Sequence, residues 1–269
     1  MHHIVSIEAG ALQAELRRPR FDHYWTEHQA TPQQQVAERL ADATIAIVNK
    51  RRLSAEIVAG LPRLQMVAIA ATGYNNVDLD ACRARGIVVS NVRGYARETV
   101  PEHVFALLLA LARQIGPYHR SVAVGRWQKS AQFCYFDYPI RDLAGQTLGI
   151  LGNGTLGQGV ARIAAAFGMR VVFGEHKGAT TCRDGYQPFE RLIREADAIS
   201  LHCPLNDATR HLIGAAELAA MKPDALLINT ARGGVSWTTP WQWWSISSTA
   251  SIRSRQARQR PGEPLASMR

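Results

Sequence analysis

Three glycines in the middle of the chain have the spacing of a phosphate-binding turn. The segment Gly152-Asn153-Gly154-Thr155-Leu156-Gly157 follows the apolar run Thr147–Leu151 and precedes a small-residue stretch with helical character. In such a turn the first glycine permits the tight bend, the second lets backbone approach a pyrophosphate, and the third lets helix and strand pack closely. The helix N-terminus adds N–H groups, here those of Thr155 and Leu156, and a partial positive charge. The segment therefore predicts dinucleotide binding.

An acidic residue lies where such a turn needs one for the ribose. Glu175 follows Gly154 by 21 positions and ends a second apolar run, Arg170–Phe173. A carboxylate there accepts hydrogen bonds from ribose hydroxyls and repels a 2′-phosphate, which favours NAD. His176 and Lys177 come next, and they either attract a phosphate, which leaves NADP open, or lie in a solvated loop.

Short apolar runs alternate with amphipathic stretches on both sides of residue 96. This rhythm, with near-continuous apolar strands, is typical of parallel sheets covered on both faces. We therefore expect an α/β fold of two Rossmann-like or flavodoxin-like domains. The expected strands are His3–Ile7, Ala43–Val48, Gln65–Ala70, Ile87–Ser90, Thr147–Leu151, Arg170–Phe173, Ala198–His202 and Ala225–Asn229. The expected helices are Pro32–Ala43, a short one capped by Ser54, Leu79–Arg85 capped by Asp78, Gln158–Phe167, Phe189–Glu195 and Ala215–Met221.

A long apolar helix is expected between the two halves. Residues 98–115 are apolar nearly all round, which predicts burial between domains or subunits, and Gly116-Pro117 is expected to end the helix. The aromatic, irregular stretch Gly125–Asp142 is expected to form an arm that packs on a neighbouring subunit.

Composition excludes several classes of protein. Five arginines and one glutamate after Val235 account for four of the nine net positive charges, and no basic stripe or nucleic-acid motif occurs, so no nucleic-acid partner is expected. No apolar run is long enough to span a membrane, and the N-terminus lacks a signal-peptide layout. Four cysteines without CxxC spacing predict free thiols in a cytoplasmic protein and no metal site.

Further segments carry a family resemblance. They are Ala-Thr-Gly-Tyr-Asn-Asn-Val-Asp at 71–78, Asn-Val-Arg-Gly-Tyr at 91–95, Gly-Arg-Trp at 125–127, Leu-Ala-Gly-Gln-Thr-Leu-Gly at 143–149, His-Cys-Pro-Leu at 202–205 through Thr209, and Met-Lys-Pro at 221–223 through Asn-Thr-Ala-Arg-Gly-Gly at 229–234. Together with the glycine turn, they resemble the D-isomer-specific 2-hydroxyacid dehydrogenases, especially members like glycerate dehydrogenase/hydroxypyruvate reductase. The resemblance runs from about Ala43 to Val235.

The resemblance implies roles for individual residues. The backbone around Thr72, Gly73 and Tyr74 would bind a substrate carboxylate, and a glycine-bearing loop after a parallel strand does expose N–H groups to an anion. Arg232 would grip the carboxylate and polarise the 2-oxo group with its planar donor fork; the alternative for Arg232 is a surface ion pair. Pro204 and Thr209 would line the adenine side, and Thr230 and Ala231 would lie near the nicotinamide.

The same resemblance implies where the domains lie and which catalytic group the chain lacks. It implies a substrate domain at 1–96, an NAD-binding domain at 97–235 and a homodimer. Reduction of a ketone also needs a proton donor, which in the family is a histidine paired with a carboxylate beyond the Arg-Gly-Gly segment. Here the last histidine is His211, and the only acid after Val235 is Glu263. We therefore expect an oxidoreductase with impaired activity; the alternative is an inactive dinucleotide-binding scaffold or regulator.

The segment 236–269 breaks the pattern and is expected to be an aberrant, disordered tail. It holds four of the six tryptophans and no periodic pattern. If Ser236–Pro240 is encoded TCG-TGG-ACG-ACG-CC, reading one base earlier gives an aliphatic residue or Phe and then Val-Asp-Asp-Ala, as the family has. A frameshifted, truncated family member is one interpretation and a divergent tail the other. Either predicts low stability and an exposed final strand, Ala225–Asn229.

Overall fold

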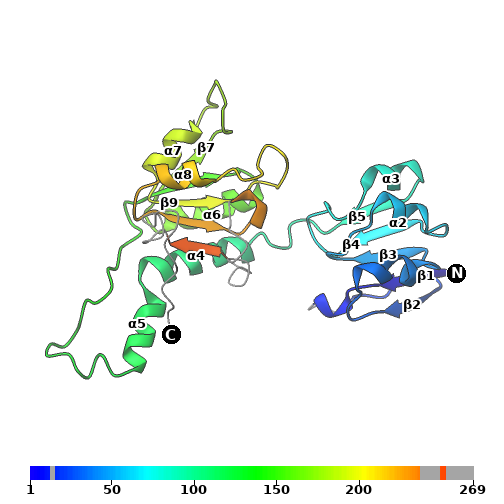
Figure 1. Cartoon of the computed structure of the whole chain (residues 1–269), viewed down its shortest axis with the longest axis horizontal. Helices are drawn as coiled ribbons and strands as arrows, with labels where there is room; N and C mark the ends of the chain where they lie inside the picture. The colour runs from blue at the N-terminus through cyan, green and yellow to red at the C-terminus, as the bar shows by residue number, and fades with distance from the viewer. Residues whose placement is uncertain (13–15, 237–248, 253–269) are drawn as a thin grey trace, which may run out of the picture. The chain divides into compact units, whose positions relative to one another are not determined.

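The computed structural model describes residues 1–12, 16–236 and 249–252 (Figure 1). The chain divides into two compact units, Met1–Tyr95 and Ala96–Arg269. The division falls one residue before the predicted domain boundary.

The first unit is a five-stranded parallel sheet. Its strands are β1 (His2–Ser6), β2 (His23–Glu27), β3 (Ile45–Val48), β4 (Met66–Ile69) and β5 (Val88–Asn91), in the order β2-β1-β3-β4-β5. Helices α1 (Val36–Leu40), α2 (Ala55–Ala59) and α3 (Leu79–Ala84) connect them, with 3₁₀ turns η1 (Ala9–Ala11) and η2 (Gln33–Gln35). The strand order is that of flavodoxin-like folds, as expected.

Local signals in this unit are confirmed where they rest on capping. The Ser54 hydroxyl accepts a hydrogen bond from the Ile57 N–H at 3.4 Å, and the Asp78 carboxylate accepts one from the Ala81 N–H at 2.9 Å. The helix expected over Pro32–Ala43 is shorter, because its first turn is the 3₁₀ turn η2. Strand β2 was not expected: it lies at the sheet edge, where no residue is fully buried and apolar alternation is weak.

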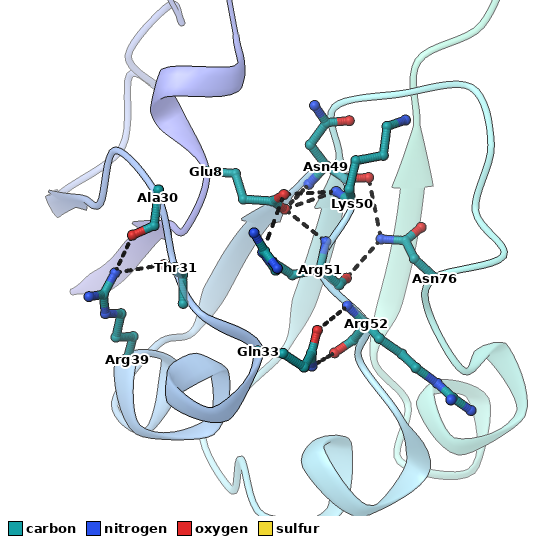
Figure 2. A network of polar contacts seen from close by, with 10 residues as sticks. All are labelled: Glu8, Ala30, Thr31, Gln33, Arg39, Asn49, Lys50, Arg51, Arg52 and Asn76. Carbon is teal, nitrogen blue, oxygen red and sulfur yellow. Dashed lines mark hydrogen bonds and ion pairs between the residues drawn. The ribbon is translucent and has the colours of Figure 1, made fainter. Parts of the chain in front are cut away.

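A buried carboxylate joins the ends of β1 and β3 (Figure 2). Glu8 is 7% exposed, and its oxygens accept hydrogen bonds from the backbone N–H groups of Asn49, Lys50 and Arg51 at 2.8–3.1 Å. Asn76 then donates from its amide to the carbonyls of Asn49 (3.4 Å) and Arg51 (3.0 Å). The Glu8 carboxylate thus fixes the loop after β3, and the Asn76 side chain ties that loop to the loop after β4.

The second unit is a six-stranded sheet. Its strands are β6 (Thr147–Leu151), β7 (Arg170–Gly174), β8 (Tyr186–Gln187), β9 (Ala198–Leu201), β10 (Leu226–Asn229) and β11 (Thr249–Ile252), in the order β11-β10-β9-β6-β7-β8. All neighbours pair in parallel except β10 and β11. From β8 to β10 this is the Rossmann order, with a switch point between β6 and β9. Helices α6 (Thr155–Ala166), α7 (Phe189–Glu195) and α8 (Ala215–Ala220) connect the strands, and the 3₁₀ turn η3 (Gly233–Val235) follows β10.

The long apolar helix expected over 98–115 ends at Ala112, and a second helix follows it. Helix α4 (Thr99–Ala112) packs its buried face, with Val104 and Leu108, into the cluster that also contains β6 and α6 residues. Its expected end at Gly116-Pro117 is wrong: α5 (Ile115–Ala123) begins there. Proline is tolerated in a first helical turn because the N–H it lacks has no acceptor there. The irregular arm expected over Gly125–Asp142 contains no helix or strand.

The expected exposure of the last predicted strand is wrong. On β10, Leu226 and Ile228 are 3% and 0% exposed in one apolar cluster, and Leu227 lies in the cluster on the other face. The strand's outer edge pairs antiparallel with β11. Within the predicted tail, Ser236 is also buried, and its hydroxyl accepts a hydrogen bond from Asn229 at 2.9 Å. Residues 249–252 form β11, so the expected disorder is wrong for this part of the tail. The remainder of the tail, with its four tryptophans, lies outside the described residues.

Candidate functional site

The glycine turn has the geometry that its sequence predicts. Gly152 follows β6 with φ of +111°, a conformation that side chains rarely allow, and a Cβ there would lie 2.6 Å from the His202 carbonyl carbon. A Cβ on Gly157 would lie 2.0 Å from the Gly152 carbonyl oxygen, so the turn and α6 touch at this point. By contrast, a Cβ on Gly154 would meet no atom within 4 Å. Two glycines are therefore needed for packing, while the third faces open space.

Backbone donors surround that open space. Gly154 caps α6 in an extended conformation, and the first hydrogen bond of the helix runs from the Gln158 N–H to the Gly154 carbonyl at 2.9 Å. The N–H groups of Thr155 and Leu156, in the first turn, have no intrahelical acceptor. An anion at this helix end would meet these donors and the positive end of the helix dipole. The turn therefore fits the pyrophosphate of a dinucleotide.

Glu175 is at the predicted place, but it already has partners. It follows β7 and is 5% exposed. Arg183 donates from Nε and Nη2 to the two carboxylate oxygens, both at 2.7 Å, and the backbone N–H groups of His176 (2.9 Å) and Arg183 (3.1 Å) add two bonds. The hydrogen bonds from the Arg183 side chain, followed by that from His176, lower the pKa of Glu175 to about 2. The carboxylate is ionised and fully engaged.

The two basic residues after Glu175 differ in their surroundings. Lys177 pairs with Glu217 of α8 at 2.8 Å, and its ammonium lies 5.8 Å from the centre of the Phe189 ring. His176 is exposed. Lys177 thus forms its ion pair with helix α8. The cation that contacts Glu175 is Arg183, which no sequence pattern indicated.

The residues that follow β9 and β10 lie at the same end of the parallel strands as the glycine turn, on the other side of β6 from Glu175. The Thr209 hydroxyl donates to the Pro204 carbonyl at 2.5 Å, so both residues belong to one closed loop. Ala231 donates its N–H to the Asn229 side chain at 3.1 Å. Two buried polar atoms there, Nδ1 of His202 and the hydroxyl oxygen of Thr230, have no hydrogen-bond partner among the described residues. Unpaired buried polar atoms are costly, so they mark a place where a polar ligand would be stabilised.

His202 is poorly suited to serve as a proton donor. Its Nε2 lies 2.8 Å from the Ser200 hydroxyl, and burial lowers its pKa to about 4. With that pKa the imidazole is neutral at pH 7, because burial removes the water that would stabilise its charged form. A general acid needs a pKa near the working pH, so His202 is unsuited to that role.

Arg232 is free at the end of β10. It is exposed, makes no ion pair with any residue that the structure describes, and donates only to the adjacent Ala231 carbonyl at 2.8 Å. Its backbone is held instead: its carbonyl accepts from the Asn229 amide at 2.9 Å and from the Val235 N–H at 3.1 Å. Among the described residues, Arg232 therefore has no partner for the surface ion pair that was the alternative. Its guanidinium remains available for an anionic ligand.

The predicted carboxylate-binding loop lies in the first unit, after β4. The Thr72 hydroxyl donates to the Val92 carbonyl at 2.8 Å, and Asn91 donates to the Thr72 carbonyl at 2.7 Å. In the described part of the chain, the N–H groups of Thr72, Gly73 and Tyr74 donate no hydrogen bond. Three consecutive free donors in a braced loop suit a carboxylate. These three predicted site residues lie in the first unit, and the other predicted site residues lie in the second.

Other classes of site find no support among the described residues. No group of three or more histidine, cysteine, aspartate or glutamate side chains is placed to hold a metal ion. The four cysteines, all at described positions, are free thiols. No described helix is long and apolar enough to cross a membrane.

Comparison with known proteins agrees with the geometry. Residues 105–238 match the family model for the D-isomer specific 2-hydroxyacid dehydrogenase, NAD binding domain. The chain is 46% identical over 233 residues to the glycerate dehydrogenase of Methylorubrum extorquens, a match that covers 86% of this chain and 73% of that enzyme.

Solved structures agree as well. The D-lactate dehydrogenase of Aquifex aeolicus, complexed with NAD and lactic acid, superposes with a TM-score of 0.68 at 26% identity over 87% of this chain and 70% of that one. An acyclic imino acid reductase, Bsp5, in complex with NADPH and D-Arg, gives 0.70 at 28% identity over 87% and 76%. The chain therefore belongs to the D-isomer-specific 2-hydroxyacid dehydrogenase family of NAD(P)-dependent oxidoreductases.

Proposed function

We propose that the chain reduces a small 2-oxo acid, hydroxypyruvate or glyoxylate, to the D-2-hydroxy acid at the expense of a reduced nicotinamide cofactor. The observation that carries the proposal is Arg232, an exposed guanidinium with no carboxylate partner among the described residues, in the loop that follows the parallel strand β10 of the nucleotide sheet. The relative named glycerate dehydrogenase supports the substrate class. A compact 2-oxo acid offers the carboxylate and carbonyl that an arginine fork and free N–H groups recognise.

In this proposal, one set of residues binds the cofactor and another binds the substrate. The turn glycines Gly152, Gly154 and Gly157, with Thr155 and Leu156, hold the pyrophosphate. Glu175, Pro204 and Thr209 line the adenosine half, and Thr230 and Ala231 lie at the nicotinamide, which supplies the hydride when bound. Arg232 binds the substrate carboxylate and polarises the 2-oxo group, and in the first unit the N–H groups of residues 72–74 are donors suited to a carboxylate.

Turnover is proposed to be slow because the proton donor is missing. Residues 236–269 contain no histidine, and His202 is held neutral by burial. The residues that bind cofactor and substrate would then work without a positioned acid. If no turnover occurs at all, the chain is a dinucleotide-binding scaffold.

The test is reduction of hydroxypyruvate and of glyoxylate by the full chain with NADH and with NADPH. We expect measurable oxidation of the cofactor, abolished by Arg232→Ala while cofactor affinity stays unchanged. Arg210→Ala, at an exposed arginine with no ion pair among the described residues, is the matched control and should leave the rate unaltered. Cofactor binding without turnover would favour the scaffold, and equal rates for Arg232→Ala and wild type would remove Arg232 from the site.

We also propose a homodimer formed through the arm at 125–142. The arm exposes Trp127, Phe133 and Phe136 at 53%, 87% and 80%, an unusual amount of aromatic surface for a monomer. Light scattering should give twice the chain mass of 29.7 kDa, and the double variant Phe133→Ser/Phe136→Ser should give the monomer mass. A monomeric wild type at micromolar concentration would contradict this.

A further inference from the structure

The segment between β7 and β8 folds Arg183 back onto the end of β7. Besides its two bonds to Glu175, the guanidinium carbon lies 3.9 Å from the centre of the Tyr186 ring. The Tyr186 hydroxyl accepts a hydrogen bond at 2.8 Å from the side chain of Asn153, a residue of the glycine turn. Arg183 is therefore fixed to the acid that ends β7 and, through Tyr186, to the turn that fits a pyrophosphate.

The contacts of Glu175 remove the usual reason for excluding a 2′-phosphate. A free carboxylate at this position repels that phosphate and accepts hydrogen bonds from the ribose. An ionised carboxylate has about four acceptor directions, and four N–H groups contact the two oxygens of Glu175 here. Its charge is balanced by Arg183 at 2.7 Å. A phosphate placed beside this pair would meet no isolated negative charge.

Arg183 keeps donors that face solvent. Its side chain is 53% exposed although its partner is buried. Nε and Nη2 are used on Glu175, while Nη1 makes no hydrogen bond with any described residue. A planar guanidinium with free N–H groups is well suited to bind phosphate oxygens. Lys177 does not compete for this role, since it pairs with Glu217.

We propose that Arg183 recognises the 2′-phosphate of NADPH, so that the chain accepts the 2′-phosphorylated dinucleotide at least as readily as NADH. Nη1 binds the phosphate while Nε and Nη2 remain on Glu175, and Tyr186 supports the plane of the guanidinium. The inference rests on the proposed dinucleotide function of the glycine turn and adds the cofactor class. Arg183 is a specificity-determining residue and takes no part in hydride or proton transfer.

The test uses nucleotide fragments without nicotinamide, so that binding is measured apart from turnover. Adenosine 2′,5′-bisphosphate and adenosine 5′-monophosphate, which differ only in the 2′-phosphate, are titrated calorimetrically into the full chain. Adenosine 3′,5′-bisphosphate carries the same added phosphate elsewhere on the ribose and controls for general attraction to a basic protein. We expect the wild type to bind the 2′,5′-bisphosphate at least as tightly as the monophosphate and more tightly than the 3′,5′ isomer.

Arg183→Gln is expected to weaken 2′,5′-bisphosphate binding by about tenfold or more, the effect of losing a charge-assisted hydrogen bond, and to leave the monophosphate nearly unchanged. Arg183→Lys keeps the charge without the fork and should fall between the two. The matched control is Arg191→Gln, at an arginine on α7 that pairs with Glu195 at 2.9 Å. Circular dichroism establishes that each variant is folded.

Two results would overturn the proposal. One is a wild type that binds the monophosphate about tenfold more tightly than the 2′,5′-bisphosphate, which means that Glu175 still excludes the phosphate. The other is an equal loss of both nucleotides in Arg183→Gln, which means that Arg183 only supports the fold of the site. A wild type that binds none of the nucleotides would overturn the dinucleotide function as well, whereas binding of the monophosphate alone overturns the assignment of Arg183 only.

Discussion

Gly157→Ala is expected to abolish dinucleotide binding and to destabilise the nucleotide unit by about 2 kcal/mol. The added Cβ would lie 2.0 Å from the Gly152 carbonyl oxygen and 3.1 Å from its carbon. Because the obstacle is backbone, no side chain can rotate away, and either α6 or the turn must shift. Alanine gains about 1 kcal/mol of helix propensity over glycine. Overpacking costs up to about 3 kcal/mol, so the clash outweighs the gain.

Gly154→Ala is the matched control for this substitution. Its Cβ would meet no atom within 4 Å, and its φ of −85° suits any residue, so stability should stay within about 0.5 kcal/mol of wild type. Nucleotide binding should nevertheless weaken, because the side chain projects into space proposed for the pyrophosphate. Urea unfolding and calorimetric titration separate the two effects. A Gly157→Ala variant with wild-type stability and affinity would mean that α6 does not depend on this close contact.

Strands that are buried on both faces could be predicted from the sequence, and they position most of the nucleotide site. The run Thr147–Leu151 is β6 to the residue, and the expected Ala225–Asn229 differs from β10 by one position. Continuous apolar residues can only be satisfied inside a covered sheet, so the pattern has one structural solution. The glycine turn follows because its position after β6 fixes where α6 begins.

Edge strands and long-range side-chain pairs could not be predicted. β2, β8 and β11 are short or polar and exist because a neighbouring strand offers hydrogen-bond partners, which no local pattern records. The contact of Arg183 with Glu175 depends on how the irregular segment between β7 and β8 folds back, and no helix or strand pattern in that segment records it. The acid was therefore predicted at its correct position, but its partner was not.

The largest functional effect is expected from the proposed lack of a proton donor in this chain. A positioned acid or base contributes about 10²- to 10⁴-fold to rate, so turnover of hydroxypyruvate should fall short of the Methylorubrum extorquens relative by about that factor. Because cofactor and substrate binding rely on other residues, their affinities should be affected far less. The two enzymes are compared in single-turnover reactions at saturating reduced cofactor, so that product release does not hide the difference.

Added imidazole should partly restore this rate. A small acid that diffuses into the site can donate the proton that residues 236–269 lack, so the rate should rise with imidazole concentration and track its protonated fraction, falling as the pH increases. Arg232→Ala should show no such rescue, because an unpolarised and unanchored 2-oxo group gains little from a free acid. 1,3-Dimethylimidazolium, which carries charge but no transferable N–H proton, should have no effect on wild type. A rate equal to that of the relative without imidazole would contradict this, because it would mean that another group in this chain already donates the proton.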